Sequence, residues 1–135
     1  MGKNDDMPRK ESITFFEKVM SGHNMVKSFA RESSQIYIIH KINGDKIKVY
    51  ITDIYTVGMA DYLDIVSNYP DLDAIITLSN WNSYTKQVKE ETIKNNFGIF
   101  VLEEFMGALN YDDACKYIKK DRKGKPIRFW RSSAD

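Results

Sequence analysis

The chain has 135 residues, of which 42% are hydrophobic and 13% aromatic, a composition that fits one globular core and excludes a disordered chain. No apolar run reaches the roughly 18 residues of a membrane span, and residues 1–10 lack the apolar stretch of a signal peptide, so we expect a cytoplasmic protein without a membrane partner. The net charge of +1 excludes a uniformly basic or acidic molecule. The single cysteine excludes a disulfide within the chain.

The chain is predicted to open with a flexible N-terminus, residues 1–9, followed by a helix. Apolar residues recur in this part at spacings that suit a helix: Ile13, Phe16, Met20, Val26 and Phe29. Gly22 lies inside this pattern and is expected to bend or split the helix.

A β-hairpin is predicted next. Two β-branched runs, residues 35–42 and 46–52, flank the dipeptide Asn43-Gly44, whose residues tolerate the positive φ of a type I′ turn. In the second run three alternate residues point to one face: Ile47, Val49 and Ile51. We therefore expect that face to be packed, and the opposite face to be wet or to line a cleft.

A short amphipathic helix over residues 62–69 is expected to end at Pro70, which disfavours helical angles in the residue before it. The apolar run 74–78 is rich in isoleucine and predicts a central strand that is covered on both faces.

A polar loop, residues 79–83, separates this strand from the next predicted helix, which runs to residues 95–96. Another strand follows at 99–102. A crossover helix between two strands predicts a parallel βαβ unit. The last predicted helices cover residues 103–109 and 112–120.

Three pieces of this pattern carry a resemblance to a known family: Ile75 to Asn80, which lead a strand into a short polar loop, Tyr84-Thr85 at a helix start, and Gly98-Ile99 at the opening of a strand. With the order of elements, they resemble the restriction-endonuclease-like (PD-(D/E)XK) superfamily, particularly its Mrr-like branch, over roughly residues 12–109. The resemblance implies an α/β three-layer sandwich. Its mixed sheet would include a β-hairpin and a βαβ unit, with a helix preceding them, in a domain spanning residues 10–115.

Nucleases of this family place an Asp and an acid-x-Lys triplet on the hairpin strands, where two carboxylates hold Mg²⁺ and the lysine helps to orient or activate the attacking water. Here the corresponding segment reads Asp53-Ile54-Tyr55, with tyrosine in place of the lysine. We therefore expect a domain that keeps the fold without efficient cleavage and needs no cofactor. The alternative is a Mg²⁺-dependent nuclease with a displaced catalytic set: Glu17, Asp45, Lys48 and Asp53.

The loop at residues 79–83 follows a central strand at its carboxyl end, where ligands of open α/β sheets tend to bind. The candidate ligand residues are Ser79, Asn80, Trp81 and Asn82, together with Tyr55. In the alternative interpretation, Asn82 or Ser83 caps the following helix and Trp81 covers the core.

Residues 116–135 are predicted to form a basic tail. Residues 116–131 hold eight of the twenty Lys and Arg residues against one acid, so this segment carries +7 and the remaining chain −6. Cations beside aromatic residues can pair phosphates and stack on bases. The expected nucleic-acid contacts are Arg122, Lys123, Lys125, Arg128, Trp130 and Arg131.

Three functions follow from these patterns. The leading hypothesis is an accessory or regulatory protein that binds DNA or RNA through the tail. The second is the active nuclease described above. The third is a protein–protein adaptor that uses its aromatic surface and its tail, which could dock on an acidic partner or on the protein's own acidic body. Oligomers are compatible with all three.

Overall fold

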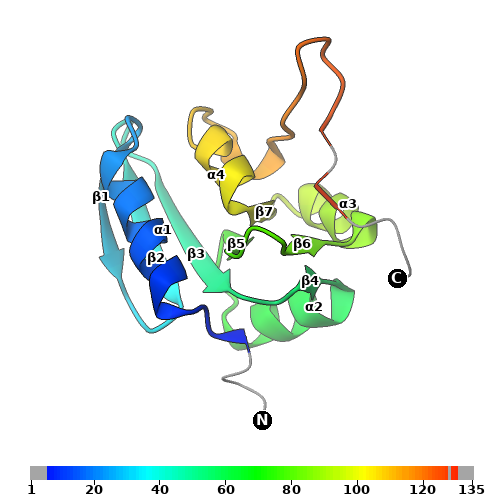
Figure 1. The fold of residues 1–135 in the computed structure, drawn as a ribbon, viewed down its shortest axis with the longest axis horizontal. Coiled ribbons are helices and arrows are strands. Elements are labelled where there is room, and N and C mark those ends of the chain that lie inside the picture. Colours follow the sequence, from blue (N-terminus) through cyan, green and yellow to red (C-terminus); the bar gives the residue numbers. More distant parts are fainter. Residues whose placement is uncertain (1–5, 128, 131–135) are drawn as a thin grey trace.

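The computed structural model describes residues 6–127, 129 and 130. A five-stranded mixed sheet forms its centre, in the order β1-β2-β3-β5-β7 (Figure 1). The first three strands are antiparallel, while β3, β5 and β7 are parallel to one another. The strands are β1 (Val26–Arg31), β2 (Ile36–Lys41), β3 (Lys46–Thr52), β5 (Ala74–Thr77) and β7 (Gly98–Val101).

Four α-helices and a short turn accompany this sheet: α1 (Lys10–Gly22), α2 (Met59–Asn68), α3 (Lys86–Lys94), α4 (Leu102–Ala108) and the 3-10 turn η2 (Ala114–Lys116). A second, two-stranded parallel sheet joins β4 (Thr56–Val57) to β6 (Ser83–Tyr84). Within the described residues, no helix has both the length and the apolar character needed to cross a membrane.

Helices cover both faces of the five-stranded sheet. On one face, Phe16 of α1 and Phe105 of α4 pack with Val49 of β3 in one hydrophobic cluster. On the other face, Ile65 of α2 and Val88 of α3 belong to a second cluster, which contains alternate residues of the same central strands. The period of two along a strand thus divides the apolar residues of β3, β5 and β7 between two cores. The molecule is an α/β domain with a helical layer on each side of a mixed sheet.

The predicted hairpin and βαβ unit are confirmed. β2 and β3 pair in antiparallel register. The turn is not the expected type I′, because Gly44 has a φ of +98° but Asn43 does not have a positive φ. β5, α3 and β7 follow one another with β5 and β7 parallel and adjacent. The polar face of β3, however, is not wet throughout. It is exposed at Lys46 but buried at Tyr50 and Thr52, because α2 and the second core cover the end of the strand.

The prediction that the first helix extends through Val26 and Phe29 was wrong. The helix ends at Gly22, and both residues lie in β1. A β-bulge between Val26 and Ser28 shifts the register, so residues three apart in sequence both pack against the first core. A bulged strand therefore has the same apolar spacing here as a helix.

Both ends of the domain also differ from the predictions. Asp6 and Arg9, expected in a flexible segment, contact the domain, while residues 1–5 lie outside the described residues. The helix predicted at 112–120 is limited to η2. The chain leaves it in an extended conformation at Tyr117, whose ring stacks on that of Tyr111 with 5.2 Å between centroids.

Candidate functional site

Polar residues gather where the parallel strands end. β3, β5 and β7 run in the same direction, so their carboxyl ends meet at one edge of the sheet. Asp53 follows β3, and Ser79 lies two residues beyond the end of β5. This carboxyl edge is where α/β folds usually bind ligands, because the loops that leave the strands form a crevice there.

The carboxylate of Asp53 is held by the loop that follows β5. Its Oδ1 accepts hydrogen bonds from the hydroxyl of Ser79 and from Nδ2 of Asn82, the latter at 2.8 Å. Asn82 also donates to Oγ1 of Thr77 at 3.0 Å, and the Thr77 hydroxyl donates to the carbonyl of Ile54 at 2.8 Å. The predicted site residues Asp53, Ser79 and Asn82 are thus brought together by direct hydrogen bonds.

A second polar group at this edge converges on Asp6. Its carboxylate accepts hydrogen bonds from the hydroxyl of Tyr50 at 2.8 Å and from Nε2 of Gln35 at 3.2 Å. Its carbonyl oxygen accepts from the backbone N–H of Asp53 at 2.7 Å and from the hydroxyl of Thr52 at 3.1 Å. We call these four donors the Asp6 cradle. Burial and the bond to Asp6 raise the pKa of Tyr50, which keeps its hydroxyl protonated as a donor.

A pocket of about 370 Å³ adjoins Asp53 on the side of β5 and β7. Its lining residues come from three parts of the chain: the candidate ligand loop after β5, the end of β7 with the start of α4, and the tail. They are Leu78, Ser79, Asn80, Trp81, Asn82, Ser83, Val101, Leu102, Glu103, Phe129 and Trp130. Four of the five predicted ligand residues therefore line one pocket. The fifth, Tyr55, is 58% exposed and is not among the lining residues.

The alternative interpretation of this loop, as a helix cap and core cover, does not match the structure. Thr85 is the N-cap of α3, and its hydroxyl oxygen accepts a hydrogen bond from the N–H of Val88 at 3.1 Å. Ser83 lies in β6, and Trp81 is 58% exposed. The guanidinium of Arg9 lies 5.5 Å from the centroid of the Trp81 ring. The loop is thus a pocket wall rather than a helix cap.

The acids proposed for a displaced catalytic set are not brought together. Asp45 and Asp53 lie just beyond opposite ends of β3, and eight residues of extended chain span about 25 Å. Glu17 accepts a hydrogen bond from the hydroxyl of Tyr37, on the face of the sheet that α1 covers. In the part of the chain that the structure describes, no three His, Cys, Asp or Glu residues are grouped so as to hold a metal ion.

Lys48, the fourth member of that set, is committed to other partners. Its ammonium lies 2.7 Å from a carboxylate oxygen of Asp71 and 3.1 Å from one of Glu32. These hydrogen bonds raise the pKa of Lys48 and lower that of Asp71. Lys48 therefore acts as a surface ion-pair residue at the opposite half of β3 from Asp53.

A buried charged cluster was missed by the sequence reasoning. Lys89 and Glu104 are 2% and 1% exposed, with 3.3 Å between Nζ and Oε2. Nζ also donates to the carbonyl of Ile99 at 2.8 Å, while the hydroxyl of Tyr84 and the N–H of Val101 donate to Glu104. Burial lowers the pKa of Lys89 and raises that of Glu104, and each charge opposes the shift of the other. The cluster ties α3, α4 and β7 together.

The basic segment forms a projecting loop. Residues 119–127 turn back on themselves through the pairing of Lys120 with Pro126, and rise away from the rest of the chain at the top of Figure 1. We call them the basic loop. Asp121 is exposed, and its carboxylate accepts hydrogen bonds from the backbone N–H groups of Lys123 and Lys125. Four cations of the loop are exposed: Lys120, Arg122, Lys123 and Lys125.

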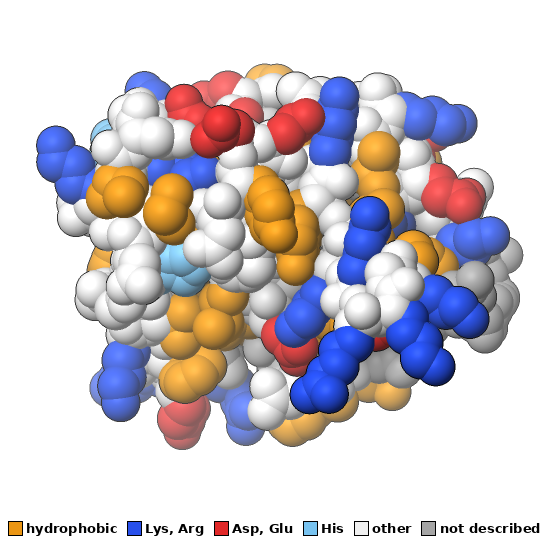
Figure 2. Space-filling view, turned by 90° about the horizontal axis from the view of Figure 1, so that it is seen from above, with side chains coloured by type: hydrophobic (Ala, Val, Ile, Leu, Met, Phe, Trp, Pro, Cys, Tyr) orange, Lys and Arg blue, Asp and Glu red, His pale blue; other side chains and the backbone are white. Residues whose placement is uncertain are grey.

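Figure 2 looks down on this end of the molecule and shows Lys and Arg side chains gathered around the loop that points toward the viewer. Two of the predicted nucleic-acid contacts, Arg128 and Arg131, lie outside the described residues. Trp130 packs partly against the second core and lines the pocket rather than extending from the basic loop.

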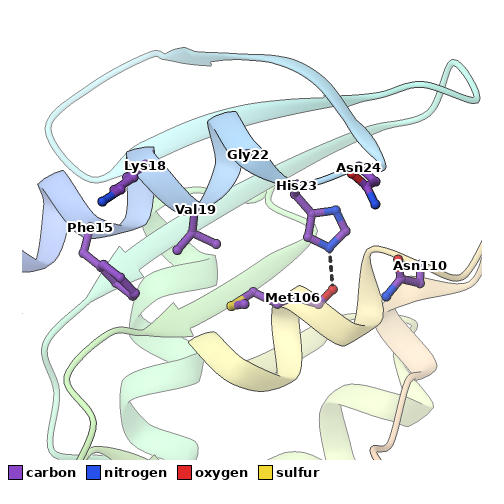
Figure 3. Close-up of a pocket in the computed structure, with 8 residues that line it drawn as sticks. All are labelled: Phe15, Lys18, Val19, Gly22, His23, Asn24, Met106 and Asn110. Carbon is purple, nitrogen blue, oxygen red and sulfur yellow. Dashed lines mark hydrogen bonds between the residues drawn. The ribbon is translucent and has the colours of Figure 1, made fainter.

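A separate groove of about 510 Å³ lies between α1 and α4 (Figure 3). His23 joins its two walls through Nε2, which donates to the carbonyl of Met106 at 2.8 Å. Nδ1 accepts the N–H of Met25, two residues further along the chain, at 3.0 Å. The residues around it are Phe15, Lys18, Val19, Gly22, His23, Asn24, Met106 and Asn110. The histidine therefore fastens the end of α1 to α4.

No family model matches the chain, and no curated protein or solved structure matches it significantly. The function of the carboxyl edge and of the basic loop has therefore to be inferred from their own residues.

Proposed function

We propose that this protein binds nucleic acid through its basic loop and carries a restriction-endonuclease-like domain that does not cleave efficiently. The observation that carries the proposal is the geometry of the loop. The loop has four exposed cations against one acid, Asp121, whose carboxylate is hydrogen-bonded to the loop backbone. A surface that presents several cations on one projection pairs with successive phosphates of a nucleic acid.

The pocket at the carboxyl edge supports this proposal. It contains Phe129 and Trp130, which follow the basic loop directly in the chain, and the exposed Trp81. Aromatic rings beside cations favour an unpaired base or a single strand over a purely acidic protein partner, because every base has a face that can stack.

Two features support the nuclease-like fold without cleavage. The sheet contains the antiparallel hairpin and the parallel βαβ unit that the resemblance implies, although its first strand, β1, was not expected. The strands β2 and β3 themselves contain no Asp or Glu. Near the carboxyl end of β3 lie the neutral side chains of Tyr50, Thr52 and Gln35, the residue before β2. These neutral groups lack the negative charge with which paired carboxylates hold a Mg²⁺ ion.

The test is fluorescence anisotropy of labelled single-stranded and duplex DNA and RNA across a salt series. Binding should weaken steeply with salt. A variant with four loop substitutions, K120Q, R122Q, K123Q and K125Q, should lose most of its affinity. For duplex DNA, its slope of log K against log salt should fall in size by up to about 3.6, since each phosphate contact contributes about 0.9.

A matched control carries four substitutions of exposed lysines outside the loop: K10Q, K27Q, K86Q and K94Q. It has the same change in net charge, so it should bind more tightly than the loop variant. Equal losses in both variants would show a general charge effect and contradict the role of the loop. Failure of the wild-type chain to bind any probe at low salt would overturn the proposal and favour the protein–protein adaptor.

Cleavage is tested on the same probes. With Mg²⁺ or Mn²⁺ present, the probes should remain intact on a gel after binding. Metal-dependent cleavage that is lost in Asp53→Ala would instead support the nuclease alternative and contradict an inactive domain.

A further inference from the structure

We propose that the pocket at the carboxyl edge holds one unpaired base of a nucleic-acid strand, and that it prefers a base with an exocyclic amino group, such as cytosine or adenine, over uracil or thymine. The inference deepens the proposed function and rests on it for the strand, because the basic loop would hold the neighbouring phosphates. A free nucleoside is the other source of such a base, and the experiments below separate the two sources.

The aromatic lining and the size of the pocket fit a base. Trp81, Phe129 and Trp130 are among the lining residues, and the volume of about 370 Å³ is typical of pockets that hold small ligands. Aromatic side chains of this kind stack on unpaired bases. Phe129 and Trp130 also lie just beyond the basic loop, within about 11 Å of extended chain. A base of a strand that contacts the loop is therefore within reach of the pocket.

The buried polar side chains of the lining offer a ligand acceptors rather than donors. The amide nitrogen of Asn82 already donates to two protein acceptors, one of which is Asp53. Its amide oxygen accepts no hydrogen bond from any residue that the structure describes, although Asn82 is only 5% exposed. Ser79 and Ser83 donate their hydroxyl protons to Asp53 and to the carbonyl of Phe129, so their oxygens can only accept from a ligand.

Such a lining selects a ligand that carries donors. The exocyclic amino group of cytosine or adenine can donate to the amide oxygen of Asn82 and to the carboxylate of Glu103, which also lines the pocket. Uracil and thymine have a carbonyl oxygen where cytosine has its amino group. That oxygen would face acceptors in the pocket without a proton between them, which is unfavourable for polar groups removed from water.

The charges around the pocket favour a neutral ligand. Glu103 is the one charged residue in the described part of the lining, so a phosphate group would meet no cation inside. The ammonium of Lys119 lies 2.7 Å from the Glu103 carboxylate, and the guanidinium of Arg9 lies 5.5 Å from the centroid of the Trp81 ring. These cations oppose a quaternary ammonium, which aromatic pockets also bind, but they attract the phosphates next to a bound base.

The first experiment uses free nucleosides, which carry no phosphate and therefore test the pocket without the basic loop. Both tryptophans of the chain, Trp81 and Trp130, line the pocket, so their two indole N–H signals in a proton–nitrogen NMR spectrum report on its occupancy. Cytidine should shift these signals with a Kd on the order of tenfold lower than that of uridine. Equal responses to both nucleosides, or no saturable shift with either, would overturn the proposal. A stronger response to choline would also overturn it and indicate a quaternary ammonium ligand.

Substitutions of exposed side chains test the lining without disturbing the core. Trp81→Ala should weaken the binding of cytidine, which is followed through the remaining indole signal. Tyr55→Ala is the matched control, because both aromatic residues are 58% exposed but Tyr55 does not line the pocket. Glu103→Gln, which adds a donor for the carbonyl of uridine, should narrow the difference between the two nucleosides. Equal affinities of the Trp81 and Tyr55 variants, or an unchanged preference in Glu103→Gln, would contradict the assignment of the pocket.

The second experiment links the pocket to a strand. In the anisotropy assay, deoxycytidine and deoxyuridine hexamers carry the same charge, so the basic loop contributes equally to the binding of both. The deoxycytidine strand should bind on the order of tenfold more tightly. Equal binding of the two strands, lost in the variant with four loop substitutions, would defeat the pocket and leave the proposed function standing. Cytidine binding by a chain that binds no strand would defeat the proposed function and assign the pocket to a free nucleoside.

Discussion

The pair Lys89–Glu104 shows how one residue can determine stability in this domain. Removal of one charge from a buried pair leaves the other without a partner, and such losses cost about 3–5 kcal/mol. Lys89→Met should therefore destabilise the protein by about that amount, measured by urea unfolding. Lys86→Met, on the same helix, is the control. Lys86 pairs with Glu90 at the surface, where an ion pair contributes at most about 1 kcal/mol.

The same variant should have a distinctive pH dependence. Burial raises the pKa of Glu104, so its protonated form is favoured in the folded chain more than in the unfolded chain. Without Lys89 to oppose this shift, stability should be retained at low pH and lost as the pH rises through the folded pKa. The destabilisation of Lys89→Met should thus be smaller at pH 5 than at pH 8. An equal loss at both values would show that Glu104 is not the group left unpaired.

Individual site residues differed in how far sequence could predict them. Asp53, Ser79 and Asn82 follow strand ends, a position that local patterns reveal. Sequence placed Asp53 in a catalytic set and the other two in a ligand loop, and the structure joins all three by hydrogen bonds. Gln35 and Asp6 lie far apart in the chain. They meet because the pairing of β2 with β3 places Gln35 beside the end of β3, where Asp6 also binds. The apolar periodicity of a sequence does not show which distant residues come into contact. The same holds for the buried cluster, since helical spacing places Lys89 on a face without showing what covers it.

At the level of elements, the start of α3 provides a test of local hydrogen bonding. Thr85→Val keeps the shape of the side chain but removes the oxygen that accepts the N–H of Val88. Loss of an N-cap costs about 1 kcal/mol. Thr92→Val makes the same chemical change inside the helix, where the hydroxyl donates to a carbonyl in the preceding turn, and should cost less. Equal unfolding free energies for the two variants would contradict a capping role for Thr85.

The elements that sequence predicted are those with a strong local signal. The hairpin has Asn43-Gly44 between two β-branched runs, and β5 is a continuous apolar run. β4 and β6 have two residues each, too few for any period to be visible. β1 was mistaken for helix because its bulge imitates helical spacing. These elements were missed or misassigned because they are too short, or too irregular in backbone, to show the apolar period of a regular strand or helix.

The whole molecule is expected to unfold in one step. Its two hydrophobic cores lie on opposite faces of the same strands, so unfolding of β3 and β5 would disrupt both cores together. Calorimetry should show a single transition with an enthalpy on the order of 90 kcal/mol, from about 0.7 kcal/mol per residue. The calorimetric and van't Hoff enthalpies should agree. Two resolved transitions would mean that the halves of the sheet fold separately.

The bulge in β1 has a consequence for how the protein behaves in a crowded solution. β1 lies at the edge of the sheet and pairs with β2 alone, so its outer side presents backbone groups that a strand of another chain could bind. The bulge makes that side irregular, and the exposed Lys27 and Arg31 would meet the same charges on a second copy. Edge-to-edge growth of the sheet into fibrils is thereby discouraged, and removing the extra residue should remove part of that protection.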